Sequence, residues 1–511
     1  MVFSRQILKP SSKDEGVYKA LSEIFGEEDV SKSELDRISY SRDSWSKTSL
    51  WLRDGEIRYP PDYIVWAKDV QQISRLLRFA QEKKIPVIPF GGGSGVCGGT
   101  LPIKGGIILD LKKMDKILSL DDKSLTVTAE VGIIGERLER ELNRKGYTLG
   151  HHPQSIYCST LGGWLAARSA GQLSTKYGKI EDMVLSMQVV LPDGDILETK
   201  TTPKSATGPD FTQTFVGSEG TLGVITKATL RVSPYPELRA FSGFMFGELA
   251  LGLETIRKIL RRGVRPASVR LYDPLDTFVF KLTGEKKESK GRRILKMAKD
   301  KVEDLIFLKP QMVNKLASLV KGRCLLIFMF EGDREIIETE KRVSDNICRV
   351  EGGEDLGEKM GIRWWETRFD VAYNLSKVFK SGAFADTIEV AGTWDKLFNL
   401  YEEVKSAVSP YAFIMAHFSH AYKEGCSVYF SFLSRGKDKE ESEELFSKIW
   451  ELALSACAKA GGTISHHHGV GIAKANFMEG ELGGAMRVYK ELKQVLDPNN
   501  ILNPGKMGLD K

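Results

Sequence analysis

The sequence predicts an α+β protein built from two main domains, and three observations lead to this fold class. The chain has 511 residues, enough for about three units of about 150 residues each. Its 41% apolar and 28% charged residues are typical of a folded globular protein. Helical and strand patterns alternate up to about residue 237, after which longer amphipathic helices appear. We expect a helical extension over residues 1–55, one domain over 56–237 and a second over 238–511.

Short elements of both kinds follow one another in the first domain. Asp69 can cap a helix, and apolar residues at helical spacing follow it from Val70 to Ala80. Strands are predicted over residues 86–89, 106–111, 125–131 and 187–191, with a helix over 134–142 and a further strand from Asp195. These patterns predict two halves that meet near residue 150.

The second domain combines longer helices with strands and carries a basic segment. Helices are predicted over residues 249–262, 394–408 and 440–460, and strands over 324–331, 387–390 and 427–432. Residues 281–323 hold 13 Lys and Arg against 5 Asp and Glu, a local charge of +8 in a chain of net charge +6. We interpret them as a basic helical insertion. Two readings stay open: a solvated helical face, or weak contact with an anionic membrane surface.

The remaining composition predicts a cytoplasmic protein. No apolar run reaches the roughly 18 to 20 residues that a membrane span needs. The first ten residues lack an apolar segment followed by a small-residue cleavage site. The six cysteines stand apart without a CxxC pair, which fits a reducing compartment. The mild net charge gives no reason to expect nucleic acid, and only the basic insertion suggests a position peripheral to the membrane.

The strongest local signal is the stretch Pro89-Phe-Gly-Gly-Gly-Ser-Gly-Val-Cys-Gly-Gly-Thr100. Six of the nine residues from Gly91 to Gly99 are glycine, so backbone N–H groups can approach an anion closely. The stretch contains a GxGxxG pattern, but Leu101-Pro102 follows where a dinucleotide fingerprint needs a helix. No GxxxxGK[ST] pattern occurs in the chain. A plain turn would explain one or two of these glycines but hardly six.

Two further loops are rich in small residues. They are Ser159-Thr-Leu-Gly-Gly-Trp164 and Gly217-Ser-Glu-Gly-Thr-Leu-Gly-Val-Ile-Thr226. Three such loops, each beside a predicted strand, suit a long ligand that lies extended across one domain. A dinucleotide is the natural candidate.

The seven histidines fall into three groups. They are His151-His152, His417 with His420, and the run His466-His467-His468. Adjacent imidazoles repel each other when charged, so the run favours neutral rings that suit base catalysis or a metal. Zinc would need His417, His420 and one histidine of the run, but this spacing is not specific and includes no Glu. We therefore assign no metal.

Together these motifs resemble the vanillyl-alcohol oxidase/p-cresol methylhydroxylase superfamily of flavoproteins, and within it the alkyldihydroxyacetonephosphate synthase (alkylglycerone-phosphate synthase) family. Further matching segments are Tyr177-Gly-Lys-Ile-Glu-Asp182, Ala267-Ser-Val-Arg-Leu271, Ser465-His-His-His-Gly-Val-Gly471 and Asp497-Pro-Asn-Asn-Ile-Leu-Asn-Pro504. The likeness runs from about residue 40 to residue 507.

The resemblance implies a two-part PCMH-type FAD-binding domain followed by an α+β cap domain that binds substrate. No histidine stands in the first glycine loop, where some relatives attach the flavin, so we expect non-covalent FAD. The cofactor-binding residues that the resemblance implies are Pro89, Gly91, Gly92, Gly93, Ser94, Gly95, Pro153, Ser155, Ser159, Thr160, Gly162, Gly163, Arg168, Ser169, Glu219, Gly220, Thr221, Val224 and Ile225.

The resemblance also implies catalytic residues in the second half of the chain. Tyr422 matches the family's proton-transferring tyrosine, and His466, His467 and His468 match its histidines. The family's phosphate-binding arginine falls on Leu375, which cannot bind a phosphate dianion. Arg368, Lys377 or Lys380 could replace it. We assign Arg368 and His417 to the substrate, His417 because it matches the cap histidine of D-lactate-type relatives.

Three functions stay open. The first is an FAD-linked dehydrogenase or oxidase of a 2-hydroxy acid or related alcohol, with hydride passing to flavin N5 and a histidine as base. The second is a genuine alkylglycerone-phosphate synthase, which exchanges acyl for alkyl on dihydroxyacetone phosphate through a flavin N5 adduct. The third is a flavin-binding protein without catalysis. Leu375 favours the first over the second. The expected ligand is a small molecule, and the family's dimeric habit leaves a homodimer open.

Overall fold

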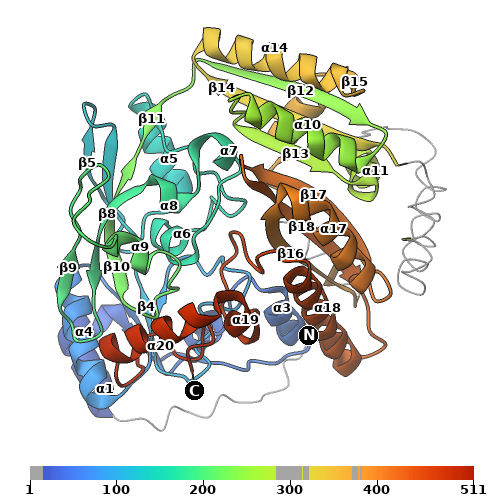
Figure 1. Cartoon of the computed structure of the whole chain (residues 1–511). Coiled ribbons are helices and arrows are strands. Elements are labelled where there is room, and N and C mark those ends of the chain that lie inside the picture. Colours follow the sequence, from blue (N-terminus) through green and yellow to red (C-terminus); the bar gives the residue numbers. More distant parts are fainter. Residues whose placement is uncertain (1–14, 283–313, 315–321, 371–377, 380–381, 511) are drawn as a thin grey trace, which may run out of the picture. The chain divides into compact units, whose positions relative to one another are not determined.

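The computed structural model describes residues 15–282, 314, 322–370, 378–379 and 382–510. Contacts divide the chain into two compact units (Figure 1). The first unit comprises residues 1–171, 177–235 and 467–511, and the second comprises residues 172–176 and 236–466. Each unit contains both helices and strands, in agreement with the predicted α+β class.

The first unit is built on three sheets. Their strand orders are β1-β2-β4-β3, β5-β6-β10-β8-β9 and β11-β7. The strands are β1 (Val30–Ser31), β2 (Tyr63–Trp66), β3 (Val87–Phe90), β4 (Ile107–Asp110), β5 (Ile117–Asp121), β6 (Thr126–Glu130), β7 (Tyr147–Thr148), β8 (Val184–Val190), β9 (Ile196–Glu198), β10 (Val224–Arg231) and β11 (Ser233–Pro234).

The helices of this unit lie around the sheets. They are α1 (Glu15–Phe25), η1 (Glu27–Asp29), α2 (Glu34–Ser39), α3 (Ser46–Arg53), α4 (Val70–Lys83), α5 (Gly135–Arg144), α6 (Leu161–Ala167), α8 (Ile180–Met183), α9 (Phe211–Phe215), η3 (Ala475–Phe477), α19 (Met478–Leu482) and α20 (Gly484–Leu496). The short helix α7 (Ser174–Tyr177) begins in residues that group with the second unit.

Helix α4 shows how the sequence produces the crossover before the glycine loop. The Asp69 side chain accepts a hydrogen bond from Gln72 N and caps the helix, as predicted. The helix connects β2 to β3, and both strands pair in parallel with β4 between them. Ile64, Ile88 and Ile108 from these three strands form one buried cluster. The strand β3 therefore delivers the glycine loop at its carboxyl end.

The predicted meeting of two halves near residue 150 is wrong. The chain leaves the first sheet after β4, at Asp110, and enters the second with β5 at Ile117. The reason is that β5 and β6 form a hairpin and β6 pairs with β10, so the strand predicted over 125–131 belongs to the second sheet.

The C-terminal residues group differently from the expected division at residue 237. Residues 467–511 group with the first unit. Leu502 forms a parallel bridge with Val87, and the Asn503 side chain donates to the backbone carbonyls of Gly99 and Glu219. Hydrogen bonds to the first glycine loop and the strand before it thus draw the last segment into this unit.

The second unit is built on one seven-stranded sheet of order β15-β12-β14-β13-β17-β18-β16. Its strands are β12 (Leu238–Phe246), β13 (Ser268–Tyr272), β14 (Cys324–Gly332), β15 (Glu354–Gly357), β16 (Phe384–Thr393), β17 (Phe413–Ala421) and β18 (Gly425–Ser434). Its helices are α10 (Leu249–Arg261), α11 (Pro274–Leu282), α14 (Arg334–Val350), α15 (Lys359–Thr367), α17 (Trp394–Val408) and α18 (Lys439–Lys459).

The longer helices cover one face of this sheet. Trp450 of α18 donates to the Asp386 carboxylate on β16, and Gly252 of α10 packs against Leu271 on β13. Because side chains alternate along a strand, Glu389 and Arg270 point to the opposite face. The residue register of β13, β17, β18 and β16 places both on that one face.

The basic insertion over 281–323 lies mostly outside the described residues, so its predicted helical structure and lipid contact stay predictions. Among the residues that the structure describes, no helix combines the length and apolar character that crossing a membrane requires.

Candidate functional site

The three small-residue loops lie against one another in the first unit. A Cβ on Gly91 would lie 2.2 Å from Thr160 Oγ1, and one on Gly92 would lie 1.9 Å from the Cys158 carbonyl oxygen. In the third loop, Gly220 has a φ of +71°, and its Cβ would lie 2.9 Å from Pro89. Glycine is therefore required at these contacts, because any side chain would push the loops apart.

The other predicted cofactor residues shape the same loops. Ser159 Oγ accepts a hydrogen bond from the Trp164 indole at 2.8 Å, and Thr160 caps α6 through Gly163 N. Ser169 Oγ lies 2.8 Å from His151 Nε2. Arg168 ends α6 with a φ of +51° and lies 3.5 Å from a Glu181 carboxylate oxygen.

The third loop continues into β10, which supplies the last predicted cofactor residues. The Thr221 hydroxyl donates to the Ser218 carbonyl at 2.7 Å and lies 3.1 Å from Tyr489 OH. Val224 and Ile225 are buried at the start of the strand. These residues therefore fix the loop at both ends.

Glu219 was predicted as a cofactor residue, but its carboxylate holds a protein loop. Its two oxygens accept the backbone N–H groups of Val470 and Gly471, at 2.5 and 2.9 Å. Burial raises the pKa of this carboxyl, while the two N–H groups and Lys506 act in the opposite direction. The side chain therefore anchors the segment that follows His468.

This part of the first unit fits an extended dinucleotide such as FAD. Close contacts with the second loop leave no room for side chains at Gly91 and Gly92. A glycine-rich backbone of this kind offers N–H groups that suit a pyrophosphate. The Thr100 hydroxyl at the end of the loop is buried and has no hydrogen-bond partner in the described part of the chain. A ligand oxygen would satisfy it.

The predicted histidine run is divided between the units. His467 and His468 group with the first unit, where their ring centroids lie 4.5 Å apart. His466 groups with the second unit, where Glu389 accepts its backbone N–H at 2.6 Å and the Ser465 hydroxyl at 2.9 Å. Glu389 is fully buried, so it fixes the backbone of His466 beside the face of the sheet opposite to the longer helices.

On that face His417 forms a hydrogen-bonded array with one acid and one guanidinium. His417 Nδ1 lies 3.0 Å from Asp276 Oδ2, and Arg270 Nη2 lies 2.9 Å from His417 Nε2. Burial, followed by the charge of Arg270, lowers the pKa of His417, so the ring is neutral at neutral pH. The consistent arrangement is Nδ1–H donating to Asp276 while Nε2 accepts from Arg270. His417 therefore positions the Arg270 guanidinium.

Aromatic rings surround this array. Tyr429 stacks on His417 with 5.0 Å between centroids, and Tyr272 lies 5.7 Å from it. Burial raises the pKa of both phenols to about 12, so they stay neutral. The Arg270 guanidinium also lies 5.5 Å from the Trp364 ring centroid. These buried aromatic rings lower the local polarity, which strengthens the electrostatic attraction between Arg270 and an anion.

Tyr422 lies in a second cluster of the same unit. Ser174 Oγ lies 2.7 Å from His420 Nδ1 and 3.3 Å from Tyr422 OH. The His466 ring centroid lies 5.3 Å from that of His420 and 5.6 Å from that of Tyr422. A phenol, two imidazoles and a hydroxyl at these distances can accept and pass on a proton.

The second predicted substrate residue lies apart from these contacts. Arg368, at the end of α15, stacks on Trp365 at 3.4 Å and Phe369 at 4.4 Å, and its Nη1 donates to the Trp365 carbonyl. Leu375 and the alternative cation Lys377 lie outside the described residues, as does Lys380.

Sequence reasoning gave no site role to four residues of these two clusters. Arg270 stood in a matching segment without a role, His420 was considered only as a zinc ligand, and Asp276 and Ser174 had no signal of their own. For Arg270, the alternation with apolar neighbours along its strand could have indicated that its side chain points to the other face of the sheet.

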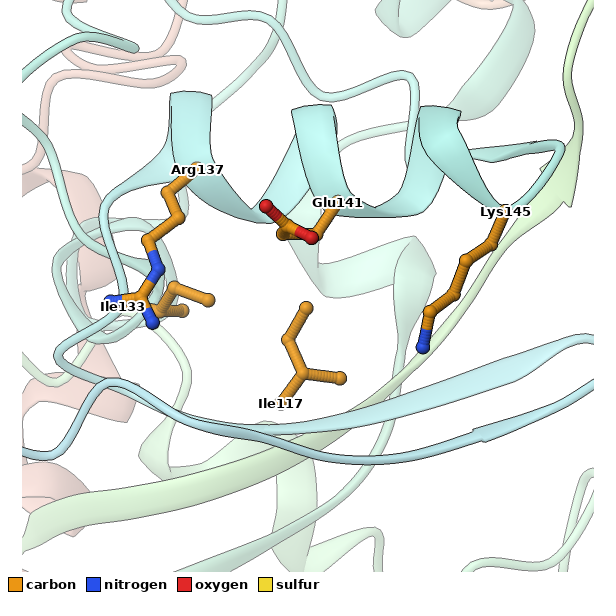
Figure 2. A pocket seen from close by; sticks show the side chains of 5 residues that line it. All are labelled: Ile117, Ile133, Arg137, Glu141 and Lys145. Atoms are coloured by element: carbon orange, nitrogen blue, oxygen red, sulfur yellow. The ribbon is translucent and has the colours of Figure 1, made fainter.

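A further pocket lies between α5 and β5 (Figure 2). Figure 2 shows it lined by Ile117, Ile133, Arg137, Glu141 and Lys145, none of which was predicted as a site residue. Arg137 also forms an ion pair with Asp115.

Comparisons with known proteins agree with the FAD interpretation. The family described as "FAD binding domain" matches residues 61–200, and that described as "FAD linked oxidases, C-terminal domain" matches residues 235–507. Alkyldihydroxyacetonephosphate synthase of Dictyostelium discoideum is 31% identical over 505 residues, covering 96% of this chain and 80% of that protein.

Oxidoreductases are similar to the chain as well. Glycolate oxidase subunit GlcD of Bacillus subtilis is 28% identical over 502 residues, with 96% of both chains covered. The solved structure of p-cresol methylhydroxylase with substrate bound matches with a TM-score of 0.71 at 19% identity, over 98% of both chains. The predicted PCMH-type fold is thereby confirmed.

Proposed function

The chain belongs to the family of FAD-linked oxidases, and from that membership we propose that it oxidises a 2-hydroxy acid or a related alcohol. FAD is its cofactor, and nothing indicates covalent attachment. When bound, FAD supplies a two-electron acceptor for the substrate C–H bond. In this proposal the loops around Gly91, Thr160 and Gly220 hold the cofactor.

The observation that carries the proposal is the array of Asp276, His417 and Arg270. A guanidinium has five N–H donors, and His417 takes one of them at 2.9 Å. Arg270 also forms a hydrogen bond with the Tyr272 side chain. The planar arrangement of the donors that remain suits a carboxylate. Because His417 and Asp276 fix the orientation of Arg270, a bound 2-hydroxy acid would be oriented by its carboxylate.

Tyr422 and His466 are the groups that we assign to the substrate hydroxyl. Their rings lie 5.6 Å apart, and Glu389 holds the backbone of His466. One of them accepts the hydroxyl proton while the adjacent ring stabilises the product of that transfer. His467 and His468 keep their predicted catalytic role as part of this proposal.

The residue at position 375 selects between substrate classes. The synthase family has a phosphate-binding arginine where this sequence has Leu375. A phosphate that loses its charged hydrogen bonds would bind more weakly by about 1.5 to 3 kcal/mol for each bond. The sequence therefore favours a substrate with a carboxylate, or with no anion, over a phosphate.

Anaerobic mixing of the flavin-loaded protein with candidate substrates tests the proposal. D-lactate, glycolate and glycerol should be compared, with absorbance near 450 nm as the readout. We expect a 2-hydroxy acid to bleach the flavin. The oxidoreductase function is excluded if no hydroxy acid or alcohol does so while the wild-type protein retains its flavin.

The second candidate is an alkylglycerone-phosphate synthase, favoured by the placement of Tyr422 beside His466 and by the identity to the Dictyostelium enzyme. Its test is incorporation of labelled fatty alcohol into acyl-dihydroxyacetone phosphate. Incorporation with the flavin still oxidised would support it. An Arg introduced by Leu375→Arg should then increase the affinity for phosphorylated substrate.

A further inference from the structure

We propose that Ser174 is a positioning residue that relays a proton between Tyr422 and His420. This inference rests on the proposed function, because it concerns the proton that leaves the substrate hydroxyl. Ser174 Oγ is the shared partner of both side chains, at 2.7 Å from His420 Nδ1 and 3.3 Å from Tyr422 OH. It is 2% exposed, so bulk water does not compete for these bonds.

The backbone is built to hold His420 at this place. Strand β17 pairs with β18 in regular register up to Ser419, and an irregularity follows before Ala421. His420 occupies that irregularity with a φ of +52°. An imidazole-bearing residue in this conformation is strained by about 1 to 3 kcal/mol, and such strain persists where surrounding contacts enforce it. The bulge turns His420 toward Ser174 instead of continuing the alternation of the strand.

The segment that carries Ser174 is tied to the same sheet. Thr175 Oγ1 accepts the backbone N–H of Ala421 at 3.2 Å, directly after the bulge. The Lys176 ammonium donates to the backbone carbonyl of Glu331 on β14. Contacts of the next two residues, Thr175 and Lys176, thus fix the backbone position of Ser174.

A serine hydroxyl can donate one hydrogen bond while it accepts another. The order that serves oxidation has Tyr422 O–H donating to Ser174 Oγ and Ser174 O–H donating to His420 Nδ1. When Tyr422 accepts the substrate hydroxyl proton, its own proton passes to Ser174 and the serine proton passes to His420. One proton leaves the substrate and one arrives at the imidazole, while Tyr422 and Ser174 end neutral.

Because Tyr422 passes its own proton to Ser174 as it takes the substrate proton, it need not exist as a stable phenolate before the reaction. Two titratable rings face His420: Tyr422 does so through Ser174, and the centroid of His466 lies 5.3 Å away. His466 influences the charge that His420 acquires, because two adjacent imidazolium rings repel each other.

Kinetics of three Ser174 variants of the flavin-loaded full chain test the transfer. Ser174→Ala should lower kcat by about 100-fold with KM within about twofold, and should reduce the solvent deuterium isotope effect. Ser174→Thr keeps the hydroxyl and should restore most of the lost turnover. Ser427→Ala is the matched control, since the buried Ser427 hydroxyl donates to the backbone carbonyl of Ser419 at 2.9 Å. Wild-type kcat in Ser174→Ala would overturn the proposal.

A second measurement does not need turnover. The chain has seven histidines, so labelled imidazole signals can be resolved, and loss of one signal in His420→Gln assigns that residue. Ser174→Ala should shift the His420 titration midpoint by about half a pH unit or more, and Ser427→Ala should not. An unmoved midpoint overturns the relay whatever the turnover. If no hydroxy acid bleaches wild-type flavin, the proposed oxidation fails, and the midpoint still decides whether Ser174 links the two rings.

Discussion

The two units of the chain prepare their sites by opposite means. The first relies on the absence of side chains, since Gly91 and Gly92 lie so close to the second loop that a Cβ would overlap it. The second relies on side chains held by other side chains, as Asp276 and His417 hold Arg270. Under the proposed function, the first unit would recognise its cofactor through the backbone, whereas exchange of single side chains in the second unit would change which substrate binds.

The largest expected effect tests the backbone site. In Gly92→Ala the new Cβ would lie 1.9 Å from the Cys158 carbonyl oxygen, so the loops must separate. A strain of about 2 to 3 kcal/mol corresponds to about 30- to 150-fold weaker FAD binding. Flavin content of the purified protein and fluorescence titration with FAD measure it. Gly247→Ala is the control because its Cβ meets nothing within 4 Å. Unchanged FAD affinity in Gly92→Ala would contradict the claim that the first unit binds FAD through closely packed backbone.

Arg270→Met tests the side-chain site. It removes charged hydrogen bonds worth about 1.5 to 3 kcal/mol, so KM for a 2-hydroxy acid should rise about 10- to 100-fold. Flavin content should stay at the wild-type level, because Arg270 belongs to the second unit. Arg257→Met, which breaks an ion pair on the surface of α10, serves as control. If Arg270→Met loses flavin and keeps its KM, the proposed assignment of FAD to the first unit and of substrate to the second is wrong.

The pH dependence of the free energy of unfolding tests whether the first unit buries His151 as a neutral ring. Burial lowers the pKa of His151 to about 3, from 6.5 in the unfolded chain. The folded state disfavours the charged ring, so this stability is present above pH 6.5 and is lost as the pH falls toward 3. About 2 kcal/mol should be lost between pH 6.5 and 5, at about 1.4 kcal/mol per pH unit. His151→Gln should flatten this part of the profile in urea unfolding at pH 7.5 and pH 5. An unchanged slope would contradict the burial of a neutral ring.

The smallest effect concerns the pocket in Figure 2. Arg137 is 46% exposed and pairs with Asp115, and exposed ion pairs contribute about 0 to 1 kcal/mol. Arg137→Ala should therefore leave turnover and FAD affinity within about twofold of wild type. A large loss of either would place part of the function in this pocket and not in the two sites compared above.

The features that the sequence predicted are those coded by neighbouring residues. The cap at Asp69 lies next to the helix it begins. The glycines of the Gly91–Gly99 stretch themselves indicate that its backbone packs closely against another loop. The array of Arg270, Asp276 and His417 escaped prediction because strand pairing brings these distant residues together. The bulge that turns His420 toward Ser174 has no local signal either, since neither glycine nor proline marks it. The change of sheet after Asp110 was missed for the same reason.

The bridge between Val87 and Leu502 has a consequence for biosynthesis. The first unit receives its last contacts from residues 467–511, whereas the second unit is complete at residue 466. On a ribosome the second unit can therefore finish folding while the glycine loop still lacks Asn503, which binds the Gly99 carbonyl. We therefore expect FAD to bind only after residues 467–511 have emerged from the ribosome, later than the residues of the second unit.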